Sequence, residues 1–287
     1  MEASRGVQPE PRVTGRRAAV LGSPIAHSLS PVLHRTAYQV LGLEGWRYDA
    51  IECREEDLPA LLDGLGPEWA GLSLTMPLKR AVLPLLDTVS DLAAAVGGAN
   101  TVVFRDGRRH GDNTDVYGIV QALTEAGVGT PSGATILGGG ATAASAIAAL
   151  RELGLSEVTV VVRSPARAAE TLRAAERLGV AVTVRGYDRF DVGDLLVSTL
   201  PPGAADHLAD RLAAAMPEKG ALFDVVYAPW PTPLARAVQE AGRTVVGGFA
   251  MLLHQAVRQV ELMTGRTDVP VEAMRAAGEA ELARRSA

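Results

Sequence analysis

The sequence of 287 residues contains a single cysteine, Cys53. One thiol excludes an intramolecular disulfide and a zinc site built from several thiolates, so we expect no metal centre and a reducing, cytoplasmic location. No uninterrupted apolar run approaches the roughly 20 residues that a membrane-spanning helix needs. Low-complexity tracts and fixed-period repeats are also lacking, which excludes solenoids and long linkers.

Positive charge is neither abundant nor clustered. The formal net charge is -5, and no basic stripe or aromatic-rich basic patch is present. Neither a nucleic acid nor a membrane is therefore an expected partner, and a small molecule fits better. The segment from Met1 to Arg17 lacks the apolar core of a signal peptide, and we expect it to be a frayed tail.

Lysine is scarce. Of 28 lysines and arginines, only Lys79 and Lys219 are lysines. Where plain positive charge suffices, this sequence uses arginine, so Lys79 points to a task that arginine cannot perform. Burial can lower the pKa of a lysine until it exchanges a proton near neutral pH, whereas guanidinium stays charged. We interpret Lys79 as an acid–base residue; the alternative is a solvated surface charge.

Short β-branched runs alternate with helical stretches, which is typical of an α/β protein. The length and the 47% hydrophobic content allow two domains. We expect strands at 18–21, 46–51, 101–104, 134–137, 158–162, 181–184, 195–198, 222–226 and 244–246. Helices are expected at about 31–41, from the glycines at 138–140 to about 153, at 251–264, and from about 270.

A glycine-rich turn follows the strand expected at 134–137. Gly138, Gly140 and Ala143 have the spacing with which a tight turn brings backbone N–H groups and a helix N-terminus against a pyrophosphate. The strand before the turn and the strand after the helix strengthen this interpretation over an ordinary βα turn. We place a Rossmann-type dinucleotide-binding domain at 117–246, and an N-terminal α/β substrate domain at 1–116 to which C-terminal helices at 247–287 return.

The second strand of this unit ends at Val162 and is followed by Arg163, Ser164 and, further on, Arg167. A carboxylate at such a strand end usually binds the ribose of NAD, whereas arginine pairs with the 2′-phosphate of NADP. No acid occupies the strand end, so NADP is favoured over NAD. The alternative is that both arginines are solvated residues at a helix start.

Three polar clusters lie in the N-terminal half. Ser28 and Ser30 follow a strand and precede Pro31, where their hydroxyls can bind a carboxylate or cap the next helix. The second cluster runs from Leu72 to Arg80 and contains Lys79. The third ends at Asp115, directly before the second domain, where a carboxylate beside Lys79 would keep the ammonium form available and orient a substrate hydroxyl.

Together these clusters resemble the shikimate dehydrogenase (shikimate 5-dehydrogenase) family over about residues 18–265. The segment Gly22–Pro31 is similar to the family's substrate-carboxylate loop, and Thr75–Lys79 to its catalytic lysine motif. Asn100-Thr101 and Gly111–Asp115 are similar to its substrate asparagine and catalytic aspartate motifs. The order and the spacing of the motifs agree throughout.

The resemblance implies an oxidoreductase of the shikimate pathway, which leads through chorismate to the aromatic amino acids. It would reduce 3-dehydroshikimate reversibly to shikimate with NADPH, and Lys79 and Asp115 would be catalytic. The substrate-binding residues that it implies are Ser28, Ser30, Thr75, Asn100, Tyr227 and Gln255. The cofactor-binding residues that we expect are Gly138, Gly139, Gly140, Ala141, Thr142, Arg163, Ser164, Arg167, Val225 and Gly248.

The sequence departs from the family pattern at several positions. Ser73 stands where asparagine is usual, and a serine is shorter, which bears on how the ring hydroxyls are held. Ala141 replaces a common glycine, Val162 an asparagine, and 198–200 also differ. These three changes touch the cofactor side and bear on cofactor preference.

Alternatives remain open. One is a quinate/shikimate dehydrogenase using NAD, and another is a non-catalytic sensor of shikimate-like ligands, although the latter predicts loss of Lys79 or Asp115. A methylene-tetrahydrofolate type of dehydrogenase would not need the serines of the first loop. Both a monomer and a homodimer are compatible with the sequence.

Overall fold

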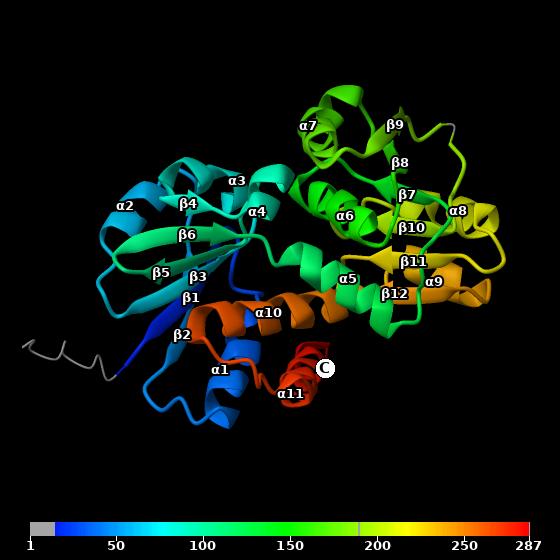
Figure 1. The fold of residues 1–287 in the computed structure, drawn as a ribbon. Coiled ribbons are helices and arrows are strands. Elements are labelled where there is room, and N and C mark those ends of the chain that lie inside the picture. The colour runs from blue at the N-terminus through cyan, green and yellow to red at the C-terminus, as the bar shows by residue number, and fades with distance from the viewer. Residues whose placement is uncertain (1–14, 189, 287) are drawn as a thin grey trace, which may run out of the picture.

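The computed structural model describes residues 15–188 and 190–286. These residues form two lobes, each built around a six-stranded sheet (Figure 1). The expected frayed tail lies outside the described residues as far as residue 14, but Arg17 is already the first residue of strand β1. The predicted tail therefore overlaps the start of β1 at Arg17.

The first sheet has the strand order β2-β1-β3-β5-β6-β4. Its strands are β1 (Arg17–Gly22), β2 (Arg47–Glu52), β3 (Trp69–Leu74), β4 (Thr88–Val89), β5 (Thr101–Arg105) and β6 (Arg108–Asp112). Strand β1 pairs in parallel with β2 and β3, whereas β5 is antiparallel to β3 and β6. Asp106 and Gly107 both have positive φ, as the two-residue turn between β5 and β6 requires.

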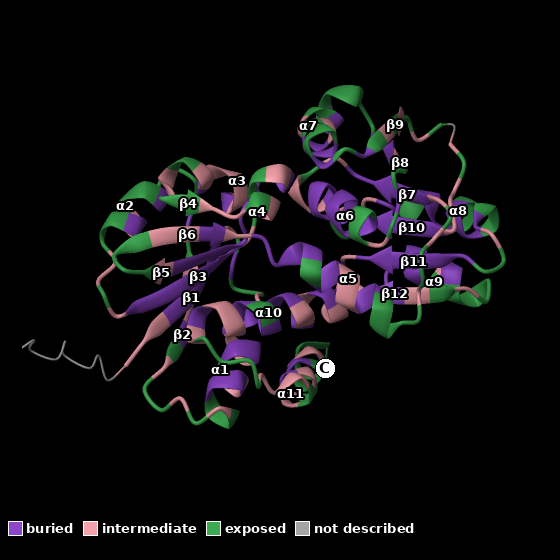
Figure 2. Cartoon of the chain, in the orientation of Figure 1, coloured by how far each residue is buried: buried purple, intermediate pink, exposed green. Residues whose placement is uncertain are grey.

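Helices cover both faces of this sheet. They are α1 (Ser30–Val40), α2 (Leu58–Asp63), α3 (Leu78–Ala81), the 3₁₀ turn η1 (Leu83–Leu85) and α4 (Asp91–Val96), together with α10 (Gly248–Thr264) and α11 (Val271–Ser286). One apolar cluster joins the sheet to α1, α10 and α11, and a second joins it to α2, α3 and α4. Strand β3 lies between them and is buried along its whole length (Figure 2).

The second sheet is entirely parallel, with the order β12-β11-β10-β7-β8-β9. Its strands are β7 (Ala134–Leu137), β8 (Glu157–Val161), β9 (Ala181–Arg185), β10 (Leu195–Ser198), β11 (Ala221–Asp224) and β12 (Thr244–Gly247). The chain order reverses between β7 and β10. In doubly wound sheets ligands bind beside such a reversal, at the carboxyl ends of the strands.

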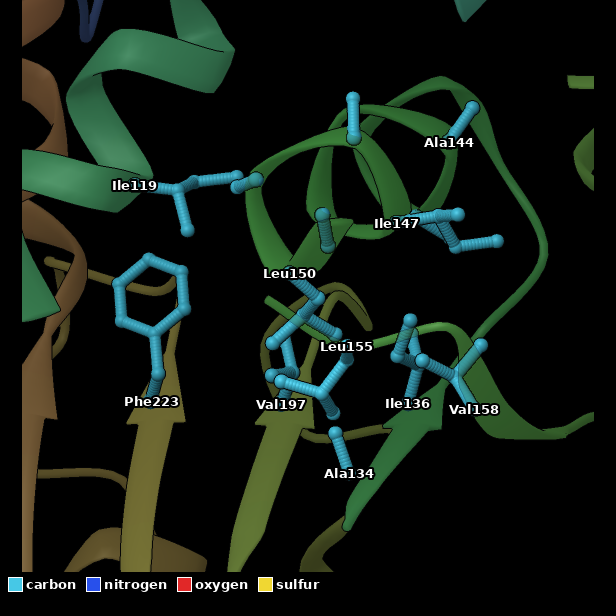
Figure 3. Packing of buried hydrophobic residues seen from close by; sticks show 14 of the residues in the cluster. Ile119, Ala134, Ile136, Ala144, Ile147, Leu150, Leu155, Val158, Val197 and Phe223 are labelled. Atoms are coloured by element: carbon cyan, nitrogen blue, oxygen red, sulfur yellow. The ribbon is translucent and has the colours of Figure 1, made fainter. Parts of the chain in front are cut away.

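The helices of this lobe are α6 (Ala141–Glu152), the 3₁₀ turn η2 (Pro165–Ala168), α7 (Ala169–Leu178), the 3₁₀ turn η3 (Asp206–Leu208), α8 (Ala209–Ala215) and α9 (Pro233–Glu240). Helix α6 is alanine-rich, and small side chains let it approach the sheet closely. Its Ile147 and Leu150 pack over Ile136 and Val197 of the strands (Figure 3).

Two helices connect the lobes. Helix α5 (Asp115–Glu125) leads from the first lobe toward the second, and α10 runs back alongside it (Figure 1). A Cβ at Gly118 would lie 2.6 Å from the carbonyl oxygen of Met251, so glycine is needed where these helices touch. Helix α10 begins at Gly248 rather than at Met251, and Pro270 lies just before α11 instead of in its first turn.

The C-terminal helices return to the first lobe, where α11 packs against α1. The predicted α/β class with two α/β units is confirmed. The domain limits at 116/117 and 246/247 stay predictions. Among the described residues, no helix is long and apolar enough to cross a membrane.

Candidate active site

A cavity of about 280 Å³ opens between the two lobes. Most of its walls come from the first lobe and from α10, while Thr142 of α6 and Val225 after β11 come from the second. Its size is just below the range of about 300–1,000 Å³ found for drug-sized ligands. It therefore suits a small molecule held by polar groups.

Lys79 and Asp115 meet in this cavity. The Nζ atom of Lys79 donates to Oδ2 of Asp115 at 2.6 Å, and the two side chains are only 16% and 5% exposed. Lys79 lies on the single turn of α3, and Asp115 is the first residue of α5. An ammonium that can give up a proton thus lies against a carboxylate that holds it in place.

Asn100 fixes the orientation of Asp115. Its Nδ2 atom donates to Oδ1 of Asp115 at 2.9 Å, and its Oδ1 atom accepts from the backbone N–H of Thr114 at 2.7 Å. The N–H of Asp115 donates to Oδ1 of Asn113 at 3.1 Å. Because these bonds come from the residue before β5 and from the loop before α5, the carboxylate is held on both sides before any ligand binds.

Ser28 and Ser30 line the same cavity, at the loop after β1. The N-cap residue of α1 is Leu29, which has no side-chain cap hydrogen bond, so neither serine is the N-cap of this helix. Oγ of Ser28 instead accepts from the N–H of Ser30 at 3.2 Å. Both hydroxyls therefore stay beside the cavity.

Glu52, at the end of β2, holds this loop. It accepts from Oγ of Ser23 at 2.5 Å and from the N–H of Ile25 at 3.0 Å. These hydrogen bonds, that of Ser23 first, lower the pKa of the Glu52 carboxyl, although the side chain is exposed. The carboxylate thus ties the loop to the sheet edge.

Thr75, Tyr227 and Gln255 complete the predicted substrate residues, and all three line the cavity. Oε1 of Gln255 accepts from Nδ2 of Asn100 at 3.3 Å, so α10 is joined to the acid–base pair. Burial raises the pKa of the Tyr227 hydroxyl, which stays protonated and able to donate at neutral pH.

The glycine turn lies at the N-terminus of α6. Gly138 has φ of 111°, and a Cβ there would lie 2.5 Å from Oγ1 of Thr199, so both the backbone and its surroundings require glycine. Gly140 caps α6 without a side-chain hydrogen bond, and a Cβ on it would have no atom within 4 Å. Packing does not require this glycine, and the open space over the helix N-terminus fits an approaching pyrophosphate.

Gly139, Ala141 and Thr142 continue this turn, and Thr142 brings it to the cavity. Val225 and Gly248 line the cavity from the other side. A Cβ at Gly248 would lie 1.9 Å from the carbonyl oxygen of Val225. Glycine at 248 is therefore demanded by packing against the residue that follows β11, whatever it also does for a ligand.

Arg163 and Ser164 lie apart from the cavity. They follow β8 at the carboxyl edge of the second sheet and are exposed, and Arg167 lies in η2, with its side chain outside the described part. No ion pair involves Arg163 within the described residues. Its guanidinium is available to an anionic ligand that extends from the glycine turn.

Sequence reasoning did not assign Gln259 and Ser73, two polar residues that line the cavity, to the site. Gln259 lies one turn after Gln255 on α10. Ser73 was noted only as a departure from the family pattern, and its hydroxyl donates to Oε1 of Gln259. The i, i+4 spacing of the two glutamines was a signal for Gln259, since such positions share a helix face. A larger cavity of about 800 Å³ lies beside β9 and is lined by none of the predicted site residues.

Comparison with known proteins supplies the family. A family model described as the shikimate dehydrogenase substrate binding domain matches residues 20–102, and one described as the shikimate 5′-dehydrogenase C-terminal domain matches residues 248–277. A relative named shikimate dehydrogenase (NADP(+)) from Thermus thermophilus is 40% identical over 271 residues, covering 94% of this chain and 98% of the relative. The chain belongs to the shikimate dehydrogenase family.

Solved structures similar to this chain include members of the same family. The shikimate dehydrogenase of Mycobacterium tuberculosis superimposes with a TM-score of 0.83 at 45% identity, covering 92% of this chain and 99% of that one. The Thermus thermophilus enzyme in complex with NADP(H) and shikimate gives 0.83 at 38% identity, with 93% and 100% covered. The resemblance of the motifs to this family is thereby confirmed.

Proposed function

We propose that this chain is an NADP-dependent shikimate dehydrogenase that reversibly reduces 3-dehydroshikimate to shikimate, a step toward chorismate and the aromatic amino acids. The observation that carries the proposal is the 2.6 Å contact between Lys79 and Asp115 in a cavity that both lobes line. A sensor has no need of an ammonium and a carboxylate held against each other. The relatives named above act on this substrate class with NADP.

The protein's own groups would bind, orient and protonate the substrate. The bound cofactor supplies the hydride. Ser28 and Ser30 would hold the carboxylate at one end, which leaves the C3 oxygen for Lys79 at the other. In the reductive direction Lys79 would donate a proton to that oxygen as negative charge develops on it, and Asp115 would keep the amine in register.

Several further contacts would position the substrate. Thr75, Asn100 and Gln255 offer polar groups toward the ring hydroxyls, and the protonated phenol of Tyr227 can donate to the carboxylate. Such fixed hydrogen bonds place the C3 carbon before reaction and lower the entropic cost of reaching the transition state.

The cofactor would lie along the carboxyl edge of the second sheet. Backbone N–H groups of the turn at Gly138–Thr142 would bind the pyrophosphate, with the open space over Gly140 as the supporting observation. Arg163, Ser164 and Arg167 would bind the 2′-phosphate that distinguishes NADP from NAD. Val225 and Gly248, which border the cavity, would lie against the nicotinamide.

A matrix of cofactors and substrates tests the proposal. Purified protein is mixed with NADP⁺ or NAD⁺ and with shikimate or quinate, and nicotinamide absorbance is followed. We expect turnover with NADP⁺ and shikimate to exceed all other combinations. Preference for NAD⁺ or quinate would instead favour the quinate/shikimate enzyme, and binding of shikimate without turnover would favour a sensor.

A further inference from the structure

A buried chain of hydrogen bonds lies beneath the cavity, between β2, β3, α1 and α10. The Tyr48 hydroxyl lies 2.6 Å from Oγ of Ser73, which lies 2.7 Å from Oε1 of Gln259, which in turn lies 3.2 Å from Nε2 of His34. All four side chains are at most 4% exposed. Of the four, Ser73 and Gln259 also border the cavity.

The orientation of the Gln259 amide follows from its partners. One end lies 3.2 Å from the backbone carbonyl oxygen of Asn100, which can only accept, so that end must be the NH₂ group. The same group donates to Oγ1 of Thr101 at 3.1 Å. The carbonyl end, Oε1, therefore faces Ser73 and can only accept from it.

This fixes every proton around Ser73. Its single hydroxyl proton is donated to Gln259, so in the bond with Tyr48 the phenol must be the donor. One lone pair on Oγ of Ser73 remains, and it can only accept.

The position of the proton on His34, at the far end of this chain of hydrogen bonds, is fixed in the same way. Oε1 of Gln259 only accepts, so Nε2 of His34 must carry a proton, and Nδ1 faces the Tyr38 hydroxyl at 3.5 Å. Burial lowers the pKa of His34 to about 3, so the ring is neutral at physiological pH and this single tautomer persists.

We propose that Gln259 is a positioning residue that fixes Ser73 as a hydrogen-bond acceptor, so that this wall of the cavity selects a ring hydroxyl and rejects a ketone or a carboxylate. The inference rests on the proposed function and assigns a direction to one of its contacts. It also explains how Ser73 can hold a ring hydroxyl although its side chain is shorter than that of the asparagine usual at this position in the family. A ligand reversed in the cavity would place an acceptor against an acceptor, which costs binding free energy.

Fluorinated analogues test the direction, because fluorine keeps the size of a hydroxyl but cannot donate. The dissociation constants of shikimate and of its 4-deoxy-4-fluoro and 5-deoxy-5-fluoro analogues are measured by calorimetry with the NADPH-loaded protein, in which these alcohols cannot be oxidised. We expect one analogue to bind about tenfold more weakly than shikimate. Equal binding of all three would overturn the proposal.

Variants of the hydrogen-bonded residues then show which of them causes the weaker binding of the fluorinated analogue. Ser73→Ala should bind shikimate about tenfold more weakly and should lose the discrimination against fluorine. Gln259→Met keeps the length of the side chain but frees the Ser73 proton, so it should also lose most of that discrimination. Tyr38→Phe removes a buried hydroxyl that ends on His34, away from the cavity, and should keep the discrimination intact.

The outcomes separate the two proposals. If Ser73→Ala retains the full penalty for fluorine, or if Gln259→Met lowers the melting temperature yet discriminates like the parent, the positioning role is wrong. The Ser73→Ala result decides the acceptor assignment even if Gln259→Met does not fold. Binding with discrimination but without turnover would reject the dehydrogenase activity and leave this inference standing.

Discussion

Lys79 shows how much one residue choice can convey. In a chain with 28 basic residues and two lysines, one lysine forms a 2.6 Å contact with a buried carboxylate and the other, Lys219, is exposed. Arginine could have formed the same ion pair, but it cannot release a proton at the pH of a cell. The choice of lysine rather than arginine at this position therefore favours proton transfer over simple charge pairing.

Replacement of Lys79 by alanine should lower kcat for shikimate oxidation by a factor on the order of 10² to 10⁴, as is typical when a general acid is removed. KM should change less, because the serine loop and Asn100 still hold the substrate. Steady-state kinetics with NADP⁺ measure both constants. Lys219→Ala is the matched control and should behave like the parent; a near-normal kcat in Lys79→Ala would remove the role assigned to it.

His34 makes stability depend on pH. Its ring is fully buried, stacks on Tyr48 at 3.9 Å between centroids and has a pKa lowered to about 3 by burial. In the unfolded chain its pKa is about 6.5. The unfolded state therefore binds one more proton between these values, and stability falls as the pH falls through this window. Tyr38 and Tyr48, which face the ring, have pKa values raised by burial and do not titrate there.

Between pH 7 and pH 5 the free energy of unfolding should drop by about 2 kcal/mol more in the parent than in His34→Gln, which cannot titrate. Urea unfolding at a series of pH values measures the difference. His27→Gln, at an exposed position, serves as the control and should keep the parent's dependence. Parallel stability curves for the parent and His34→Gln would contradict the assignment.

At the scale of elements, the turn between β7 and α6 separates two reasons for glycine. Gly138 is required by its positive φ and by Thr199, whereas no atom of the described residues lies within 4 Å of the Cβ that a side chain at Gly140 would carry. A residue that folding does not need but that leaves a helix N-terminus open is the local signature of an anion site.

Gly140→Ala should therefore cost less than about 1 kcal/mol of stability, the range of a changed helix cap, yet weaken NADP⁺ binding more than about tenfold. Calorimetric titration gives the dissociation constant, and thermal unfolding gives the stability. Gly133→Ala lies at the opposite end of β7, also in open space, and should alter neither. If both variants bind NADP⁺ like the parent, the pyrophosphate does not lie over Gly140.

At the scale of the whole molecule, the C-terminus closes on the first loop. Helix α11 packs against α1 (Figure 1). Arg285, near the end of α11, donates to the carbonyl oxygen of His27 at 2.7 Å. Arg284 and Arg285 share Glu281, and these two hydrogen-bonded guanidinium groups lower the pKa of that carboxyl to about 2. Only Arg285 reaches the loop that carries Ser28.

Arg285→Ala should raise KM for shikimate about three- to tenfold, because the carboxylate loop loses its tie to α11, and should leave KM for NADP⁺ unchanged. Arg284→Ala loses the same acidic partner without touching the loop and should stay within about twofold of the parent. Kinetics with each substrate varied in turn distinguish the two. Equal effects from both arginines would mean that helix stability, not loop position, is responsible.

The sequence determined the local structure and the chemistry. Short β-branched and apolar runs predicted the strands of the second sheet, because burial on two faces demands near-continuous apolar side chains, but β3 and β4 of the first sheet were not among the expected strands. The glycine spacing predicted the turn before α6. Lys79 and Asp115 could be singled out because their chemical types are needed at positions where a fold alone does not require them. Their roles in catalysis stay predictions, whereas the α/β fold and the family are confirmed.

The tertiary structure decided which distant residues meet. Gln259 reaches Ser73 across 186 positions, and Arg285 reaches the Ser28 loop across more than 250. Such contacts depend on the order of strands in the sheet and on the path of returning helices, neither of which leaves a local pattern in the chain. The direction of each proton under the cavity is set in the same way, by groups that only folding brings together.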